Sequence, residues 1–373
     1  MARTPLAGAL LDAALAARPL TELPIPASLD LDPAAPVRGV WTGGGQVLIA
    51  GRDADAGLPV LAVLRAGHGR RVWTGDGLLR VDQTASAAQL AALPGGQALA
   101  LITGGPLLAV SAGAKAVRPV PLPRPVALLA DPAAPGALAV LRSKTGRISL
   151  ARVPDGAHPE TSGWDLRQAD RRPGPKLDAG QTLSLVAQDH LGRLLLGVDD
   201  GARGFHLLRE EGDLWIPVAV PGASRHGMNA ALLAATRWNG ALVLAAGCGA
   251  RAASDVPGLL ISGEVLRLDD SGDLTILTGE LRTGPKRLMV PALPASHPLM
   301  LARVVAELDV TALAVWDAAL VLHLHDARRG SDRLYCLNPD LTGRFVRTAL
   351  PFAALVAGPE GPIALTWGPQ DPS

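Results

Sequence analysis

The chain has 373 residues, of which 48% are hydrophobic and 18% charged, and its formal net charge is only +1. Its 42 glycines and 32 prolines interrupt the sequence at short intervals, which excludes long helices and favours a β-rich domain with many turns. The balanced charge, without a long block of like charges, excludes the electrostatic footprint of a protein that binds nucleic acid.

Residues 1–30 are predicted to form a short helix followed by an extended arm. Thr4 can cap this helix, and an apolar stripe at helical spacing follows over residues 5–17. A signal peptide is the alternative, and it is disfavoured because Asp12 interrupts the apolar run. Residues 31–373 are predicted to form one β-propeller.

One pattern recurs along the rest of the chain. A short apolar strand is followed by a turn containing Gly, Asn or Asp, a second apolar strand and a more polar pair of strands. The clearest copy crosses Asn239-Gly240, the strongest short hairpin signal, and we predict positive φ angles at both residues. The inner hairpins begin near Val37, Ala88, Val126, Leu183, Ala230, Val310 and Ala353. These intervals are typical of four-stranded blades, so we predict an all-β propeller of seven blades, with six as the alternative.

The last repeat ends after Trp367 with only two strands. A ring must close, because an open strand edge is a template for aggregation. The segment Leu23-Pro24-Ile25-Pro26 is therefore predicted to supply an outer strand to this final half-blade, where its prolines suit an edge.

The repeats are similar to those of a known class of protein. The blades at 183–221 and 230–279, with Asn239-Gly240 and the alternating run at 263–269, resemble those of kelch-like or related bacterial β-propellers. The resemblance covers most of residues 37–367. It implies the architecture and carries no activity.

Long insertions are predicted to lie on one face of the ring. In a blade whose strands run A to D from the axis outward, the B-to-C and the D-to-next-A connections leave from the same face. We assign 154–181, 221–229 and 280–309 to connections that follow outer strands, and 247–262 to a B-to-C connection. Loops of this length are usually functional or disordered, so a binding site is predicted on this face.

The best polar cluster in these insertions is Ser224-Arg225-His226-Gly227-Met228-Asn229. It precedes an innermost strand, which would bring Arg225, His226 and Asn229 near the entrance of the central channel. The alternative is an ordinary polar turn. Arg203 and His206, in an ambiguous loop, and Arg282 complete the predicted binding residues.

Metal and cofactor sites are not predicted. His323 and His325 would share one face of a strand, as metal ligands do, but Asp326 is the one obvious carboxylate nearby and no third ligand can be located. The sequence also lacks a P-loop, a GxGxxG after a strand, a GxSxG elbow and a His-Glu-x-x-His motif.

The two cysteines, Cys248 and Cys336, are too few for a disulfide framework or a thiolate zinc site. We expect two buried thiols in a reducing compartment and predict a cytoplasmic protein. No apolar run is long enough to span a bilayer.

These observations predict a scaffold that binds a protein partner or a small polar ligand on its loop-rich face. It could also be a subunit of a larger assembly. The alternative is an enzyme, of lyase or hydrolase type, with its site at the channel mouth. In that case His226 would act as acid or base, and Arg225, Asn229 and His206 would position a polar substrate.

Overall fold

A computed structural model describes residues 20–368, apart from positions 67, 83–85, 112, 114, 121–124, 131–136, 154–170, 190, 200–204, 219–230, 248–263, 269–273, 277–308, 327–330 and 340–342. The predicted helix over residues 5–17 lies outside the described residues, as does Cys248. Cys336 is buried and forms no disulfide, as expected.

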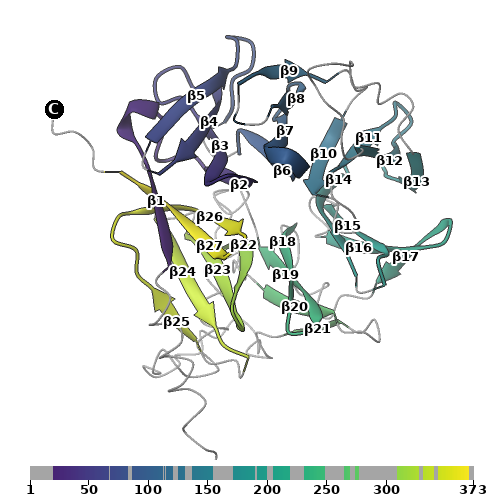
Figure 1. The fold of residues 1–373 in the computed structure, drawn as a ribbon. Coiled ribbons are helices and arrows are strands. Elements are labelled where there is room, and N and C mark those ends of the chain that lie inside the picture. Colours follow the sequence, from purple (N-terminus) through teal and green to yellow (C-terminus); the bar gives the residue numbers. More distant parts are fainter. Residues whose placement is uncertain are drawn as a thin grey trace, which may run out of the picture.

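The described strands form six four-stranded sheets and one three-stranded sheet, arranged as blades around a central axis (Figure 1). Blades 1 to 3 contain β2 (Arg38–Gly43), β3 (Gln46–Arg52), β4 (Pro59–Arg65), β5 (His68–Thr74); β6 (Ala88–Leu93), β7 (Gln97–Ile102), β8 (Leu107–Val110), β9 (Val117–Pro119); β10 (Pro125–Ala130), β11 (Ala137–Arg142), β12 (Arg147–Val153), β13 (Arg171–Lys176). Blades 4 and 5 contain β14 (Thr182–Gln188), β15 (Leu194–Asp199), β16 (Phe205–Glu211), β17 (Leu214–Val218); β18 (Ala231–Trp238), β19 (Ala241–Gly247), β20 (Glu264–Leu268), β21 (Leu274–Ile276). Blades 6 and 7 contain β22 (Asp309–Trp316), β23 (Ala319–Asp326), β24 (Ser331–Leu337), β25 (Gly343–Val346); β26 (Phe352–Gly358), β27 (Gly361–Trp367), β1 (Thr21–Ile25).

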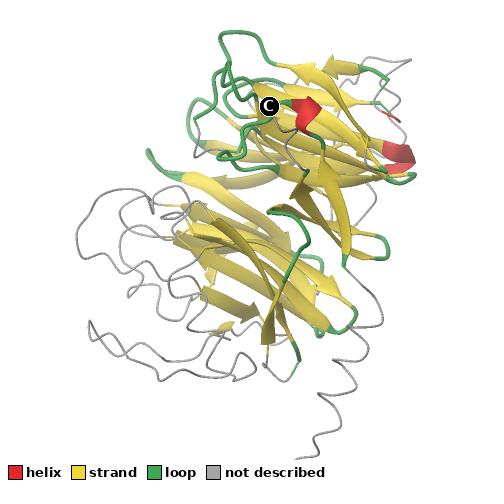
Figure 2. Cartoon of the chain, turned by 90° about the vertical axis from the view of Figure 1, so that its left-hand side faces the viewer, coloured by secondary structure: helices red, strands yellow, loops and turns green. Residues whose placement is uncertain are grey.

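The fold is therefore a seven-bladed β-propeller, which confirms the predicted fold class. Each innermost strand begins within one residue of the start predicted from the sequence. Apart from two short 3-10 turns, η1 (Ala27–Leu29) and η2 (Pro94–Gly96), the regular structure of the described residues is strand (Figure 2). The described part of the chain contains no helix with the length and hydrophobicity of a membrane span.

The ring is closed by contacts between innermost strands and by apolar packing between blades. β2, β6, β10, β14, β18, β22 and β26 contact one another in this order, and β26 contacts β2. A separate buried apolar cluster lies between each pair of neighbouring blades. Both faces of most inner strands are thus buried, which explains why these strands read as unbroken apolar runs.

The seventh blade is completed by the N-terminal arm. β1 pairs in parallel with β27, from Thr21 opposite Ile363 to Ile25 opposite Trp367. Leu23-Pro24-Ile25 therefore supplies the outer strand of the final half-blade, as predicted. Ile25 is 2% exposed and packs in the cluster between blades 7 and 1.

Strand order divides the connections of the ring between two faces. Because neighbouring strands of the four-stranded blades are antiparallel, A-to-B and C-to-D turns lie at one end, here called the turn face. B-to-C and D-to-A connections lie at the other end, here called the mouth face. The described strand ends that flank the predicted insertions between β17 and β18, β19 and β20, and β21 and β22 lie at the mouth face, in agreement with the predicted strand order.

The assignment of 154–181 to a connection after an outer strand was wrong. β12 ends at Val153 and β13 begins at Arg171, so 154–170 joins the third strand of blade 3 to the fourth and starts from the turn face. Only 177–181 follows the outer strand. The sequence of β13, RRPGPK, has neither apolar alternation nor a β-branched residue, and so it gave no strand signal.

The hairpin at Asn239-Gly240 has the predicted geometry. Asn239 has φ 50° and Gly240 has φ 76°, and Trp238 pairs with Ala241 across a two-residue loop, as in a type I′ turn.

Gly240→Val is expected to lower the free energy of unfolding by about 1–2 kcal/mol, because a β-branched residue is strained at positive φ. Gly77→Val is the matched control, since a Cβ added at either glycine would meet no atom within 4 Å and Gly77 lacks the positive φ. Urea denaturation measures both. Equal effects of the two substitutions would contradict a cost that comes from the turn geometry.

Candidate functional site

The rim of the mouth face is made by the first residues of the innermost strands. In blades 3 to 7 the pairing of the innermost strand with its neighbour shifts register near its start, by one extra residue. Such β-bulges bend a strand and redirect a side chain, and they are common at barrel rims and active sites. In blade 6 the extra residue is Thr311.

The redirected Thr311 begins a chain of polar contacts in blade 6. Its hydroxyl lies 3.0 Å from Nδ1 of His323, and Nε2 of His323 lies 2.8 Å from Oδ1 of Asp332. Nδ1 of His325 lies 2.9 Å from the same carboxylate oxygen. Asp332 lies opposite His325 in the β23–β24 pairing, and His323 lies on the same face two residues away. The two imidazoles thus share one strand face, as predicted.

The carboxylate determines how the imidazoles are protonated. An ionised Asp332 can only accept hydrogen bonds, so His323 donates from Nε2 and His325 from Nδ1. Nδ1 of His323 then accepts a hydrogen bond from the Thr311 hydroxyl. In the neutral form of His325, a proton on Nδ1 leaves the lone pair of the ring on Nε2. The cluster is therefore a preorganised set of hydrogen-bonding groups with a fixed direction.

Burial and hydrogen bonding shift the pKa values of these groups. Burial lowers the pKa of His323, which is 7% exposed, although Asp332 opposes this effect, so the ring is neutral at physiological pH. Burial raises the pKa of Asp332, but the hydrogen bonds from His323 and His325 outweigh it and bring the value to about 2. The carboxylate is therefore ionised and the buried imidazole neutral near pH 7.

A cation from another blade reaches this cluster. Arg38, the first residue of β2 in blade 1, donates from Nη1 to the carbonyl oxygen of Thr311 at 3.1 Å. Its charge acts on His323 and helps to lower the pKa of that ring. The ring of Phe352, from blade 7, meets His323 edge to face at a centroid distance of 4.8 Å. Side chains from blades 1, 6 and 7 thus meet at the rim.

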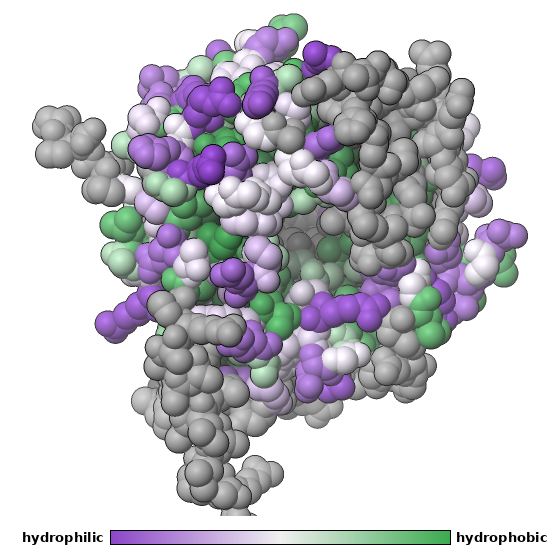
Figure 3. Space-filling model, viewed as in Figure 1, coloured by the Kyte–Doolittle hydropathy of each residue, from purple (hydrophilic) through white to green (hydrophobic). Residues whose placement is uncertain are grey.

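A space-filling view shows that the centre of the ring is hollowed, with hydrophilic and hydrophobic residues both bordering the hollow (Figure 3). No group of three or more His, Cys, Asp or Glu among the described residues is arranged to hold a metal ion.

Most of the predicted binding residues lie outside the described part of the chain. Arg225, His226, Asn229, Arg203 and Arg282 are all in this group, so their assignment stays a prediction. His206 is exposed near the start of β16 in blade 4, which places it at the mouth face.

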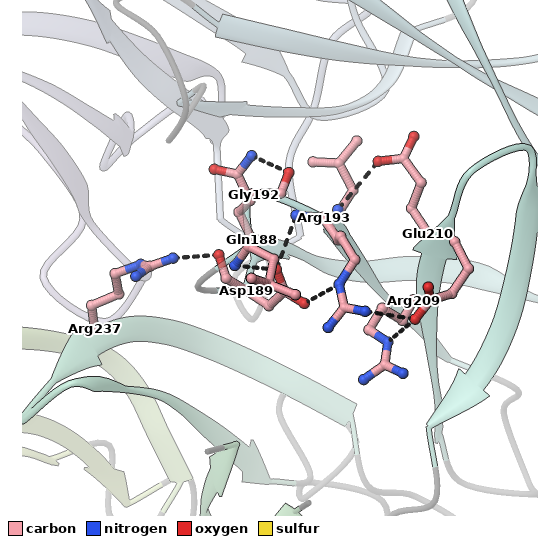
Figure 4. Close-up of polar contacts among 10 residues, drawn as sticks. Gln188, Asp189, Gly192, Arg193, Arg209, Glu210 and Arg237 are labelled. Atoms are coloured by element: carbon pink, nitrogen blue, oxygen red, sulfur yellow. Dashed lines mark hydrogen bonds and ion pairs between the residues drawn. The ribbon is translucent and has the colours of Figure 1, made fainter. Parts of the chain in front are cut away.

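A second polar cluster lies on the turn face of blade 4 (Figure 4). Asp189, 1% exposed, accepts hydrogen bonds from the backbone N–H groups of Leu191 and Arg193 and pairs with the Arg193 guanidinium at 2.6 Å. Arg193 also pairs with Glu211 at 2.7 Å, and Arg237 of blade 5 donates to the Asp189 carbonyl. The charges of Asp189, Arg193 and Glu211 compensate one another within blade 4. The hydrogen bond from Arg237 joins this blade to blade 5.

The comparisons with known proteins identify no family. No protein-family model matches the chain and no curated protein matches it, so the kelch-like assignment stays a prediction. Solved structures similar to it include three proteins. One is a prolyl endopeptidase (12% identity, TM-score 0.48, 96% of this chain and 50% of that one), so the chain spans half the length of that protein. The others are SapL1 lectin in complex with alpha methyl fucoside (13%, 0.47, 87% and 98%) and the propeller domain of the Trilobed protease from Pyrococcus furiosus (8%, 0.48, 87% and 89%). The propeller assignment itself rests on the strand order described above.

Proposed function

We propose that this chain is a binding propeller that takes a small polar ligand at the centre of its mouth face. The observation that carries the proposal is the convergence of Arg38, Thr311, His323 and Asp332, from two blades, on one part of the rim. A flat apolar face would favour a protein partner instead. A small polar ligand needs a few convergent hydrogen-bonding groups beside apolar walls, and here Phe352, whose ring contacts His323, supplies an apolar surface.

The placement of the insertions supports the same face. The segments that join β17 to β18 and β21 to β22 run from outer strands to innermost strands, so each ends at the rim. These segments include the predicted binding residues Arg225, His226, Asn229 and Arg282. Binding residues are disproportionately carried by loops on a rigid scaffold, and a closed ring of blades is such a scaffold.

The test is a saturation-transfer NMR screen of the full chain with a mixture of hexoses, amino acids, dicarboxylates and sugar phosphates. We expect at least one compound to bind, with binding weakened at least tenfold by His325→Ala. The control is His68→Ala, a histidine exposed at the start of β5 on the turn face, which should bind as the unaltered chain does. Binding that survives His325→Ala, or that both variants abolish, would contradict a site at the mouth.

An enzyme of lyase or hydrolase type is the second candidate, favoured by one observation. The Asp332–His325 pair fixes the imidazole in the tautomer whose Nε2 can take a proton, which is the arrangement of a general base held by a carboxylate. An enzyme would convert a compound found in the screen, and His325→Gln would abolish conversion more strongly than binding. A binding protein would return every compound unchanged.

A further inference from the structure

The guanidinium of Arg38 and the carboxylate of Asp332 are both partly buried at the rim, but their hydrogen-bond partners differ. Asp332 has its charge met by two imidazole N–H groups. Arg38 donates to one backbone carbonyl, and among the described residues no carboxylate pairs with it. A guanidinium carries five N–H donors, so most of its hydrogen-bonding capacity is unused by these residues.

This arrangement is costly without a counter-ion. Arg38 is partly buried, and the resulting loss of solvation lowers its pKa. Two other partly buried arginines are paired with carboxylates, Arg52 with Asp32 at 2.5 Å and Arg71 with Asp53 at 2.7 Å, whereas Arg142 is held by two backbone carbonyls. A charge left half-buried and held by one neutral acceptor is expected where a ligand supplies the missing anion.

We infer that the ligand of this propeller is an anion, a small molecule whose carboxylate or phosphate group forms a two-point contact with Arg38 at the mouth. This inference rests on the proposed function and specifies the ligand class. The planar fork of a guanidinium matches two oxygens of a carboxylate or a phosphate. The Thr311 carbonyl, by engaging Nη1, fixes the direction in which the rest of the fork points. The neutral polar part of the ligand would face the imidazole side of the cluster.

The nearby carboxylate does not oppose this assignment. Both hydrogen bonds that Asp332 accepts from the imidazoles are made to its Oδ1 atom, and no ion pair joins this carboxylate to Arg38 among the described residues. An added anion would raise the pKa of His323, because it stabilises the protonated imidazole. Arg38, Asp332 and His325 are the charged and titratable groups that act on this ring, and of these Arg38 and His325 oppose its protonation.

The experiment compares matched anionic and neutral probes on the full chain. Glucose 6-phosphate and succinate test the two sources of the anion, and glucose is the neutral match of the first. We expect at least one anion to bind with an affinity at least tenfold above that of glucose, to weaken as salt is added and to shift the Arg38 Nε–H signal in nitrogen-detected NMR of the unaltered chain. That last measurement needs no variant, so the inference stays testable if substitution of Arg38 impairs folding.

Variants separate charge from fork geometry. Arg38→Gln is expected to lose the anion by at least tenfold, and Arg38→Lys to recover part of the affinity, because it keeps the charge without the fork. Arg142→Gln is the control, since Arg142 also donates to backbone carbonyls, those of Asp178 and Gln181, but from the second strand of blade 3. It should bind the anion unchanged.

Unchanged binding in Arg38→Gln, or an Arg38 signal that does not move, would overturn the inference. Binding of neutral hexoses with no preference for anions would overturn it and leave the proposed function standing. An absence of binding by every class of compound would overturn both.

Discussion

Ile25→Ala is expected to lower the free energy of unfolding by about 3 kcal/mol, within the range for removing a large buried aliphatic side chain. Ile25 is 2% exposed and packs with Leu29 and Leu365 in the cluster that joins the last blade to the first. Its carbonyl also accepts a hydrogen bond from the backbone N–H of Gly368. The residue therefore contributes to the closure of the ring as well as to one core.

Urea denaturation followed by circular dichroism measures this loss. Leu78→Ala is the control, because Leu78 is 93% exposed and its truncation should change stability by no more than about 0.5 kcal/mol. A loss below about 1 kcal/mol for Ile25→Ala would mean that β1 is not needed to hold the seventh blade in place.

Stability is also expected to fall in two stages as the pH is lowered. A buried neutral imidazole with a lowered pKa is protonated first in the unfolded chain, so His323 should reduce stability as pH falls below its ordinary value of 6.5. Asp332 acts at lower pH. A carboxyl whose folded pKa is about 2 stabilises the fold above its unfolded value of 3.8 and loses that contribution between the two values, which amounts to about 2 kcal/mol.

Asp332→Asn separates the two stages. The variant should lose the step between pH 3.8 and about 2. Because Asp332 raises the pKa of His323, its replacement should also lower that pKa further and extend the first stage to lower pH. Asp213→Asn, in the exposed turn between β16 and β17, should leave the profile as it is. Thermal melts from pH 7 to 2 provide the measurement, and an unaltered profile in Asp332→Asn would contradict the role assigned to that carboxylate.

The inner half of each blade could be predicted from the sequence, and the outer half only where its strands alternate, as in the run at 263–269 that contains β20. Inner strands such as β19 (ALVLAAG) are buried on both faces and end at glycine or asparagine turns, so their runs and boundaries are visible. Outer strands such as β13 carry charges, prolines and glycines, and their pairing depends on the blade as a whole. This difference produced the wrong assignment of 154–170.

Only part of the candidate site could be predicted from the sequence, for a related reason. Alternation on a strand placed His323 and His325 on one face, but their partner Asp332 lies across a hairpin whose register is set by tertiary pairing. The run of β24, SDRLYCL, has no alternation of polar and apolar residues, so the sequence did not indicate on which face Asp332 lies. Nothing local indicates that Arg38, separated by 273 positions, would meet Thr311.

Closure by β1 also governs the order of events during synthesis. β1 is synthesised long before β27, which is its only paired strand among the described residues. It therefore has no strand to pair with while the residues of the six blades between them are synthesised. Contacts of such large sequence separation form late and slowly. Pro24 and Pro26 on either side of Ile25 limit what β1 can pair with during this time, since proline cannot donate to a strand ladder. The residues that make β1 a weak strand therefore protect the nascent chain until the ring can be joined.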